Sequence, residues 1–265
     1  MSVVFITGNH PRHAFIARCL AETGKLKKLI IEQREGHIPE PPADLEPELK
    51  DLFRQHFTQR SEVELEFFGP AHWPDIEIIT TDVEGLNGAE VQEHIRASNP
   101  DLLLTYGCHM LNRSTLACAS GEKWNIHGGL SPWYRGAITH FWPSYMLEPQ
   151  KTGMTVHELT QQLDAGDVVH QCVAPMVRGD GVHHVAARAV HKLGKELPDL
   201  LQLLYQQGAD KITKVAHTTT GKLWLGSQWR PEHLRVIYQF YENRVVDYYL
   251  DGKLGKSEPK LHRQF

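Results

Sequence analysis

The sequence predicts an α/β protein with a doubly wound, mostly parallel β-sheet, followed by a small mixed C-terminal module. Short apolar runs alternate with stretches of helical apolar spacing in the N-terminal part of the chain. Repeated strand–helix alternation of this kind is typical of a parallel sheet covered by helices. After a long helical stretch, the chain from residue 209 mixes threonine-rich and aromatic segments. We therefore expect a main domain at residues 1–208 and a small module at 209–265.

Each expected element follows from the spacing of its apolar residues. Short apolar runs predict strands at 3–7, 29–32, 76–79, 101–106 and 124–127. Apolar residues at helical spacing predict helices from residue 15 to the stop at Gly24, at 88–97 and at 182–207. Residues 39–68 are rich in proline and glutamate and contain one amphipathic stretch, so we expect an excursion from the sheet, as a lid or an interface.

Composition excludes several classes of protein. The 265 residues include 28 Lys and Arg against 32 Asp and Glu, a formal net charge of −4, so the chain has no overall basic character for binding nucleic acid. No apolar run reaches the roughly 18 residues of a membrane span. The first residues contain no basic leader, and the four cysteines form no C-x-x-C pair, so we expect a cytoplasmic protein with free thiols. The 17 histidines show no metal-ligand spacing, and we expect no metal.

Polar residues follow the predicted strands at their carboxyl ends, where doubly wound sheets bind ligands. Asn125 and His127 are two apart in a strand, so their side chains point to the same face. An amide can donate a hydrogen bond to an oxyanion, and an imidazole can transfer a proton near neutral pH. Asp164, on a glycine-flanked loop, could orient that imidazole. The alternative is that Asn125 and His127 satisfy buried backbone groups and Asp164 caps a turn.

Several linked motifs resemble the formyltransferases that use 10-formyltetrahydrofolate. The motifs are Asn125-x-His127, Leu130-x-Pro132-x-x-x-Gly136, the segment 152–157 and the segment 163–167, in the order and spacing of that family over residues 1–175. The resemblance implies a Rossmann-like catalytic domain of the formyltransferase fold. It also implies that Asn125, His127 and Asp164 form the catalytic triad. The family often has Ser and Leu where Gly129 and Ser131 stand, so the shape of this loop is expected to differ.

The same resemblance implies the reaction and the binding site of the formyl donor, with no metal involved. An unprotonated primary amine attacks the formyl carbon, Asn125 and His127 stabilise the oxyanion, and Asp164 holds His127 and helps to carry the proton of the amine. The loop after the 101–106 strand would hold the pteridine ring of 10-formyltetrahydrofolate, and the turn at 160–167 would close the pocket. The expected donor-binding residues are Tyr106, Gly107, Cys108, His109, Met110, Leu111, Thr160, Leu163 and Gly166.

We expect the acceptor to be a nucleotide-linked amino sugar for surface-glycan biosynthesis, such as lipopolysaccharide O-antigen. The loop after the first strand has bulky and basic residues where glycinamide ribonucleotide enzymes have a glycine-rich phosphate loop. It is still expected to meet a phosphate of the acceptor, because it lies at a helix N-terminus and adds Arg12. The alternative for this loop is a proline-initiated helix with solvated polar residues. The expected acceptor-binding residues are Asn9, His10, Arg12, His13, Trp133, Tyr134 and Arg135.

Other functions remain open at this point. The acidic charge balance and the short C-terminal module argue against a methionyl-tRNA formyltransferase. The other candidates are a formyltetrahydrofolate deformylase, a glycinamide ribonucleotide formyltransferase and a non-catalytic protein that binds folate or a sugar nucleotide. Small-molecule substrates, rather than nucleic acid, are the expected partners. The aromatic residues of the C-terminal module are expected to form its core and a dimer surface, so we expect a homodimer.

Overall fold

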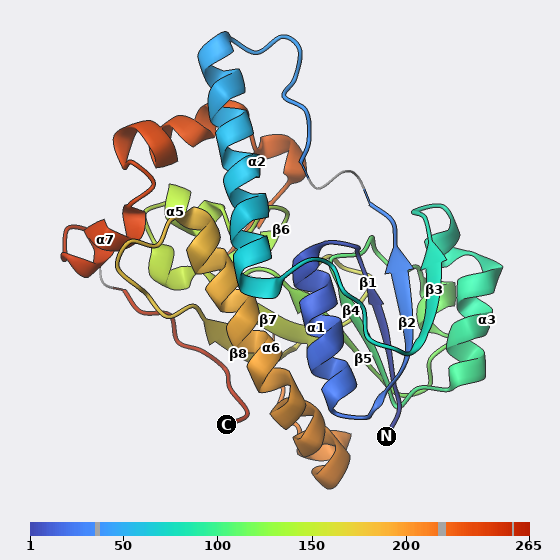
Figure 1. The fold of residues 1–265 in the computed structure, drawn as a ribbon. Helices are drawn as coiled ribbons and strands as arrows, with labels where there is room; N and C mark the ends of the chain where they lie inside the picture. The colour runs from blue at the N-terminus through green and yellow to red at the C-terminus, as the bar shows by residue number, and fades with distance from the viewer. Residues whose placement is uncertain (35–37, 217–220, 256) are drawn as a thin grey trace.

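Within residues 1–34, 38–216, 221–255 and 257–265, which the computed structural model describes, a seven-stranded sheet forms the centre of the protein (Figure 1). Its strand order is β3-β2-β1-β4-β5-β7-β8. Strands β1 to β5 are parallel, and β7 and β8 each run antiparallel to the preceding neighbour. The bounds are Val3–Thr7, Leu26–Glu32, Glu77–Thr81, Leu102–Tyr106, Glu122–His127, Gly153–Glu158 and Val168–Val173 for β1 to β5, β7 and β8. The predicted doubly wound, mostly parallel sheet is confirmed.

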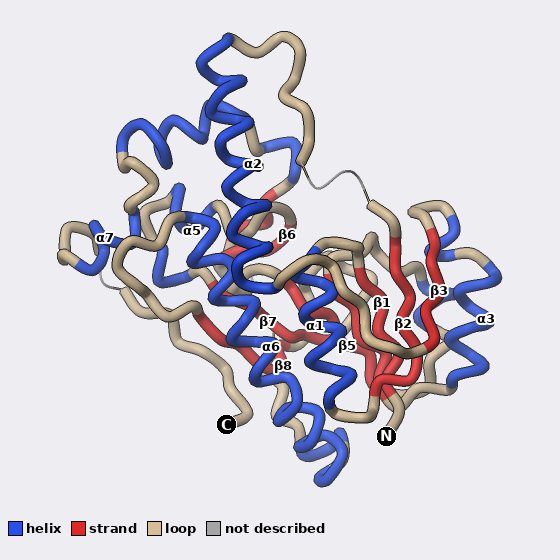
Figure 2. The backbone as a smooth tube through the Cα atoms, viewed as in Figure 1, coloured by secondary structure: helices blue, strands red, loops and turns tan. Residues whose placement is uncertain are grey.

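Helices lie on both faces of this sheet (Figure 2). Those on one face are α1 (Pro11–Glu22), α2 (Pro47–Phe68) and α6 (Val182–Gln207); those on the other are α3 (Ala89–Ser98) and the short α4 (Arg113–Leu116). The helix predicted at 182–207 is confirmed at both ends. Two short helices, α5 (Trp142–Tyr145) and α7 (Val245–Leu250), lie outside these layers.

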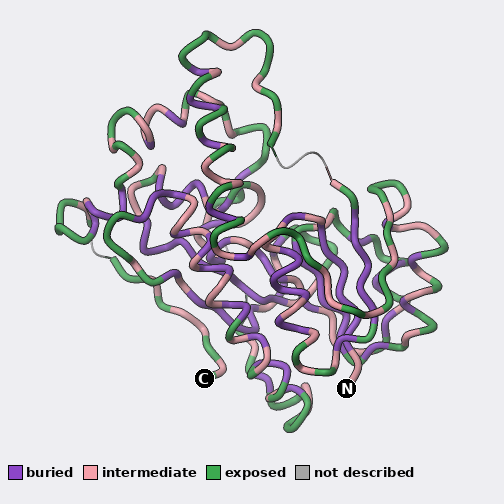
Figure 3. Tube along the Cα trace, in the orientation of Figure 1, coloured by how far each residue is buried: buried purple, intermediate pink, exposed green. Residues whose placement is uncertain are grey.

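The alternating direction of side chains along the strands explains why helices cover both faces of the sheet. In β1, Val3 and Phe5 pack into the cluster that contains α1 and α6, whereas Val4 and Ile6 pack into the cluster that contains α3. Successive side chains of a strand point to opposite faces, so a strand that is apolar throughout is buried on both sides. The buried stretches in Figure 3 follow these central strands.

Helix α2 connects β2 to β3 and joins two hydrophobic cores. Its C-terminal part, with Val63 and Phe68, packs with α1 and α6, so the expected excursion from the sheet is wrong for this half. Its N-terminal part extends beyond the sheet and lies beside C-terminal segments (Figure 1). There it contributes to what we call the second apolar cluster: Leu49, Leu52, Phe53, Tyr134, Phe141, Trp142, Val182, Trp224, Leu234, Ile237 and Val245.

The C-terminal residues also contribute one strand to a separate two-stranded sheet. β6 (Tyr134–Gly136) pairs in parallel with β9 (Lys222–Trp224), so the segment after β5 is tied to residues far along the chain.

The four cysteines are free thiols, as expected. In the part of the chain that is described, no helix is long and apolar enough to cross a membrane.

Candidate active site

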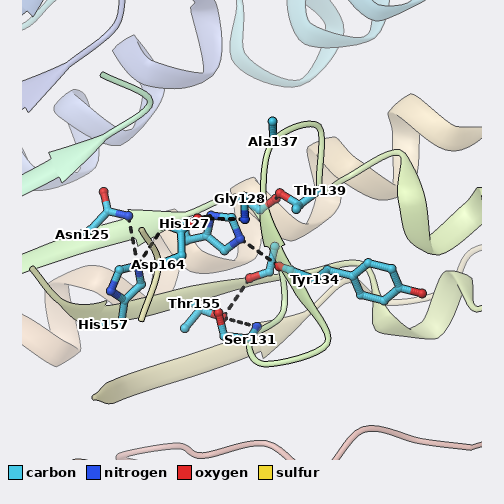
Figure 4. A network of polar contacts seen from close by, with 12 residues as sticks. Asn125, His127, Gly128, Ser131, Tyr134, Ala137, Thr139, Thr155, His157 and Asp164 are labelled. Atoms are coloured by element: carbon cyan, nitrogen blue, oxygen red, sulfur yellow. Dashed lines mark hydrogen bonds and ion pairs between the residues drawn. The ribbon is translucent and has the colours of Figure 1, made fainter. Parts of the chain in front are cut away.

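The carboxyl end of β5 carries two of the residues expected to be catalytic. Asn125 and His127 lie on the same face of the strand and point toward the loop that carries Asp164 (Figure 4). The amide of Asn125 is fixed on both sides, because Thr105 Oγ1 donates to its Oδ1 at 2.7 Å and its Nδ2 lies 3.1 Å from Nε2 of His157. This side chain is therefore oriented before any substrate arrives.

Asp164 lies between two imidazoles. Its Oδ2 is 3.4 Å from Nδ1 of His127, and its Oδ1 is 3.4 Å from Nε2 of His157. The backbone N–H of Gly136 donates to Oδ2 at 2.9 Å. Burial alone would raise the pKa of Asp164, but the charge of His127 and the N–H of Gly136 lower it well below its usual value. Asp164 therefore remains a carboxylate near neutral pH.

His127 uses both ring nitrogens in this arrangement. Nδ1 faces Asp164, and Nε2 donates to the backbone carbonyl of Tyr134 at 2.9 Å. The ring occupies space left by Gly129, where a Cβ would lie 2.4 Å from Nε2 of His127 and 2.5 Å from the carbonyl of Tyr134. The glycine that departs from the resembled family is thus required for this position of the imidazole.

His157 is a candidate site residue that the sequence reasoning missed. It stands opposite Asn125 in the β5–β7 register, and its Nδ1 donates to the carbonyl of Glu158 at 2.8 Å. In a neutral ring with this tautomer, Nε2 accepts the hydrogen bond from the amide of Asn125. The sequence does contain a signal for this residue, because His157 is the last residue of the family motif segment 152–157. However, its position between Asn125 and Asp164 depends on the cross-strand register.

The loop expected to bind the donor follows β4 at the same sheet edge as Asn125 and His127. Tyr106 and Leu111 are buried, whereas His109 and Met110 are exposed. Burial raises the pKa of Tyr106 and of Cys108 to about 12, so both stay neutral near pH 7. The loop therefore offers backbone groups and a few exposed side chains to a ligand.

The other expected donor-binding residues lie on the loop between β7 and β8. Thr160 and Leu163 are exposed, and Gly166 is buried where a Cβ would lie 2.0 Å from the carbonyl of Glu158. Asp164, on the same loop, has a positive φ of 45°. Cys108 of the first loop and Leu159 of the second both pack against the same hydrophobic cluster.

The loop between β1 and α1 is largely satisfied by its own groups. His13 is buried, its Nδ1 accepts the N–H of His10 at 3.2 Å, and its ring packs edge-on against Tyr106. Burial and the charge of Arg12 lower the pKa of His13 well below its ordinary value, so it is neutral. Arg12 forms an ion pair with Glu64 of α2 at 2.5 Å, and Asn9 donates to Gln33.

The segment 133–135 differs in part from expectation. Tyr134 is 3% exposed, its ring stacks on Trp224, and its hydroxyl donates to Glu148 at 2.7 Å. Tyr134, expected to bind the acceptor, therefore offers no open ring face to it, because pairing of β6 with β9 covers this ring. Trp133 and Arg135 are partly exposed, and their acceptor-binding role stays a prediction. Among the described residues, no group of three or more His, Cys, Asp or Glu side chains could hold a metal ion.

Known proteins share this fold. The chain is similar to a sugar N-formyltransferase from Shewanella sp., with 18% identity, a TM-score of 0.52, and coverage of 86% of this chain and 78% of that one. It is also similar to a phosphoribosylglycinamide formyltransferase from Anaplasma phagocytophilum, with 17% identity, a TM-score of 0.56, and coverage of 85% and 98%. A third structure is a sugar 3N-formyl transferase in the presence of dTDP and 5-N-formyl-THF, with 13% identity, a TM-score of 0.54, and coverage of 91% and 81%.

These identities are low, so the three structures support the fold alone. A family model for formyl transferases matches the sequence itself over residues 65–201, more than half of the chain. The matched region contains β4, β5, β7 and the loop with Asp164. The chain therefore belongs to the formyl transferase family.

Proposed function

We propose that this enzyme transfers the formyl group of 10-formyltetrahydrofolate to the primary amine of a nucleotide-linked amino sugar. Asn125, His127 and Asp164 would be its catalytic residues. One observation carries the proposal: the Asp164 carboxylate lies 3.4 Å from both His127 and His157, and the amide of Asn125 contacts the same His157. These groups provide a hydrogen-bond donor, a proton carrier and a fixed negative charge at one sheet edge.

Each group has a distinct role in the proposed reaction. The Nδ2 group of Asn125 has two hydrogens; one is directed at His157, and the other is available for the formyl oxygen. Asp164 holds His127, and it can relay the proton of the attacking amine, directly or through water, to the tetrahydrofolate nitrogen that leaves. The Nε2–H of His127 now donates to the carbonyl of Tyr134, so the ring must leave this carbonyl to reach a substrate oxygen.

The residues at the sheet edge fit a tetrahydrofolate donor, which supplies the activated formyl group. The side chains of Met110 and Leu163 are apolar and 56% and 48% exposed, and a flat pteridine ring would cover such surface. Backbone groups of the two loops can pair with its polar edge. The proposed donor-binding residues are those expected from the sequence: Tyr106, Gly107, Cys108, His109, Met110, Leu111, Thr160, Leu163 and Gly166.

The β1–α1 loop is not built like the glycine-rich phosphate loop of glycinamide ribonucleotide enzymes. A phosphate at a helix N-terminus needs free backbone N–H groups. Here Pro11 has none, while Gly8 donates to the carbonyl of Tyr106 and His13 to that of His10. The ion pair with Glu64 also compensates the charge of Arg12. Two of the similar structures act on sugars, and the product would serve a surface glycan such as lipopolysaccharide O-antigen.

The test is an incubation with 10-formyltetrahydrofolate and a panel of nucleotide-linked amino sugars. Tetrahydrofolate release and product mass are measured together, with glycinamide ribonucleotide as a parallel acceptor. A product heavier by one formyl group with a sugar nucleotide supports the proposal. Donor turnover without any amine indicates a deformylase, and formylation of glycinamide ribonucleotide alone refutes the proposed acceptor.

Two variants test the catalytic residues. His127→Ala and Asp164→Ala are expected to fold and to lose turnover by about 10²-fold or more, the range for loss of a positioned acid or base. Asp199→Ala, on an exposed position of α6, is the matched control and is expected to keep wild-type activity. Near-wild-type turnover in either catalytic variant, with circular dichroism showing a folded protein, contradicts the assignment.

A further inference from the structure

A fully buried carboxylate, Glu32, lies at the carboxyl end of β2 and binds the loop that follows β4. The side chain of Glu32 is 0% exposed. Its Oε2 accepts the backbone N–H of His109 at 2.8 Å, and its Oε1 lies 2.5 Å from Nδ1 of the same residue. A buried carboxylate is tolerated only when hydrogen bonds replace its hydration. Both oxygens of Glu32 are therefore used to hold one residue of the neighbouring loop.

Two other side chains hold the same loop. Arg34 donates to the carbonyl of Gly107 at 3.1 Å. Asn87 donates to the carbonyl of Met110 at 3.1 Å and accepts the backbone N–H of Asn112 at 2.8 Å. The backbone is thus fixed on both sides of residue 109. A loop held in this way is arranged before a ligand arrives, which lowers the entropy lost on binding.

The contact with Glu32 also determines which nitrogen of His109 carries the proton. A carboxylate only accepts hydrogen bonds, so Nδ1 must be the donor. In the neutral ring, Nε2 is then a hydrogen-bond acceptor. The side chain of His109 is 50% exposed, and its Nδ1 edge faces the buried carboxylate, so the Nε2 edge is the one left for a ligand.

We propose that Glu32 is a positioning residue that presents Nε2 of His109 as an acceptor for an N–H group of the formyl donor. A tetrahydropteridine has ring and amino N–H groups along its edge, and an imidazole acceptor beside exposed backbone complements them. This inference rests on the proposed function, because the donor-binding role of the loop does. Glu32 acts through His109 and touches no reacting atom.

Glu32→Gln tests the proposal with little change of shape. The amide oxygen can still accept the N–H of His109, but the amide nitrogen then faces Nδ1 and makes Nδ1 an acceptor. The proton moves to Nε2, so the ring presents a donor where the ligand needs an acceptor. We expect the KM for 10-formyltetrahydrofolate to rise about tenfold, the effect of one lost hydrogen bond, while kcat changes less than about twofold.

The tautomer itself is measured independently of activity. The ¹⁵N chemical shifts of the His109 imidazole are expected to show a proton on Nδ1 in the wild type and on Nε2 in Glu32→Gln. Glu77→Gln is the matched control, because Glu77 lies on β3, is 55% exposed and pairs with Lys28. It is expected to change neither the shifts nor the KM.

A pair of substitutions at His109 covers the case in which Glu32→Gln does not fold. His109→Asn keeps a donor near the position of Nδ1 and removes Nε2, so Glu32 keeps its partners. His109→Gln places an amide oxygen near the position of Nε2 and can restore an acceptor. We expect a raised donor KM in His109→Asn and partial recovery in His109→Gln, with the acceptor KM unchanged in both.

The outcomes separate this inference from the proposed function. An active wild type whose donor KM is unchanged in Glu32→Gln and in His109→Asn overturns the inference alone. The inference alone is also overturned if the ¹⁵N chemical shifts of wild-type His109 show the proton on Nε2. A wild-type protein that neither binds nor turns over 10-formyltetrahydrofolate overturns the proposed function, and the inference with it.

Discussion

A buried histidine pair between α2 and α6 predicts that the protein loses stability below pH 6.5. Nδ1 of His56 lies 3.0 Å from the hydroxyl of Tyr238 and 3.2 Å from Nε2 of His183. His56 is 5% exposed. Burial, with a smaller contribution from the charge of Arg60, lowers the pKa of His56 from 6.5 to about 3. Burial also lowers the pKa of His183.

The sign and the size of the effect follow from this pKa. Between pH 6.5 and pH 3 the unfolded chain binds a proton at His56 and the folded chain does not, so the free energy of unfolding falls as the pH falls. The slope is about 1.36 kcal/mol per pH unit for one group. From pH 6.5 to pH 5, His56 alone therefore removes about 2 kcal/mol of stability.

Urea unfolding of wild type and His56→Phe at pH 7 and pH 5 measures this loss. The phenyl ring keeps the volume but cannot be protonated, although the variant is less stable at both pH values because two polar partners lose a contact. The loss in the free energy of unfolding from pH 7 to pH 5 is expected to be about 2 kcal/mol smaller in the variant than in the wild type. His72→Phe, at an exposed position, is the control. Equal losses in wild type and His56→Phe would refute the reasoning.

Two further predictions concern the site. Gly129→Ala places a methyl group 2.4 Å from Nε2 of His127 and must displace the ring. We therefore expect kcat to fall by about 10²-fold, a typical cost of a 1 Å misplacement. A kcat within twofold of wild type contradicts this prediction. Glu64→Gln removes the charge that compensates Arg12, so inorganic phosphate is expected to inhibit about tenfold more strongly. Adding Arg12→Gln should abolish that gain, and inhibition that persists in the double variant argues against the mechanism.

The convergence of the candidate catalytic residues could be predicted from local patterns. The parallel strands β4 and β5 end at the same sheet edge, so Tyr106 and His127 had to lie near each other. Asp164 could be placed beside His127 only through the family motif, because nothing in a glycine-flanked loop fixes where its side chain points. The structure places it there with a positive φ and three partners.

The features that escaped prediction depend on pairings between distant segments. His157 reaches Asn125 through the β5–β7 register, which apolar spacing does not reveal. Tyr134 is covered because β6 pairs with a strand almost 90 residues later. Glu64 reaches Arg12 because α2 crosses over α1 on its way from β2 to β3. Periodicity identifies a helix and its apolar face, but it does not identify the partner of each polar residue.

The second apolar cluster has a consequence for how the chain folds. It combines side chains from α2, from the segment after β5, from the start of α6 and from the C-terminal residues. A fragment that ends at residue 208 would leave Leu52, Phe53 and Trp142 exposed to water, and such a surface favours aggregation. The C-terminal segment is therefore needed to complete this core, and the two parts are expected to unfold in one cooperative transition. Exchange of this segment between relatives would have to include the matching face of α2.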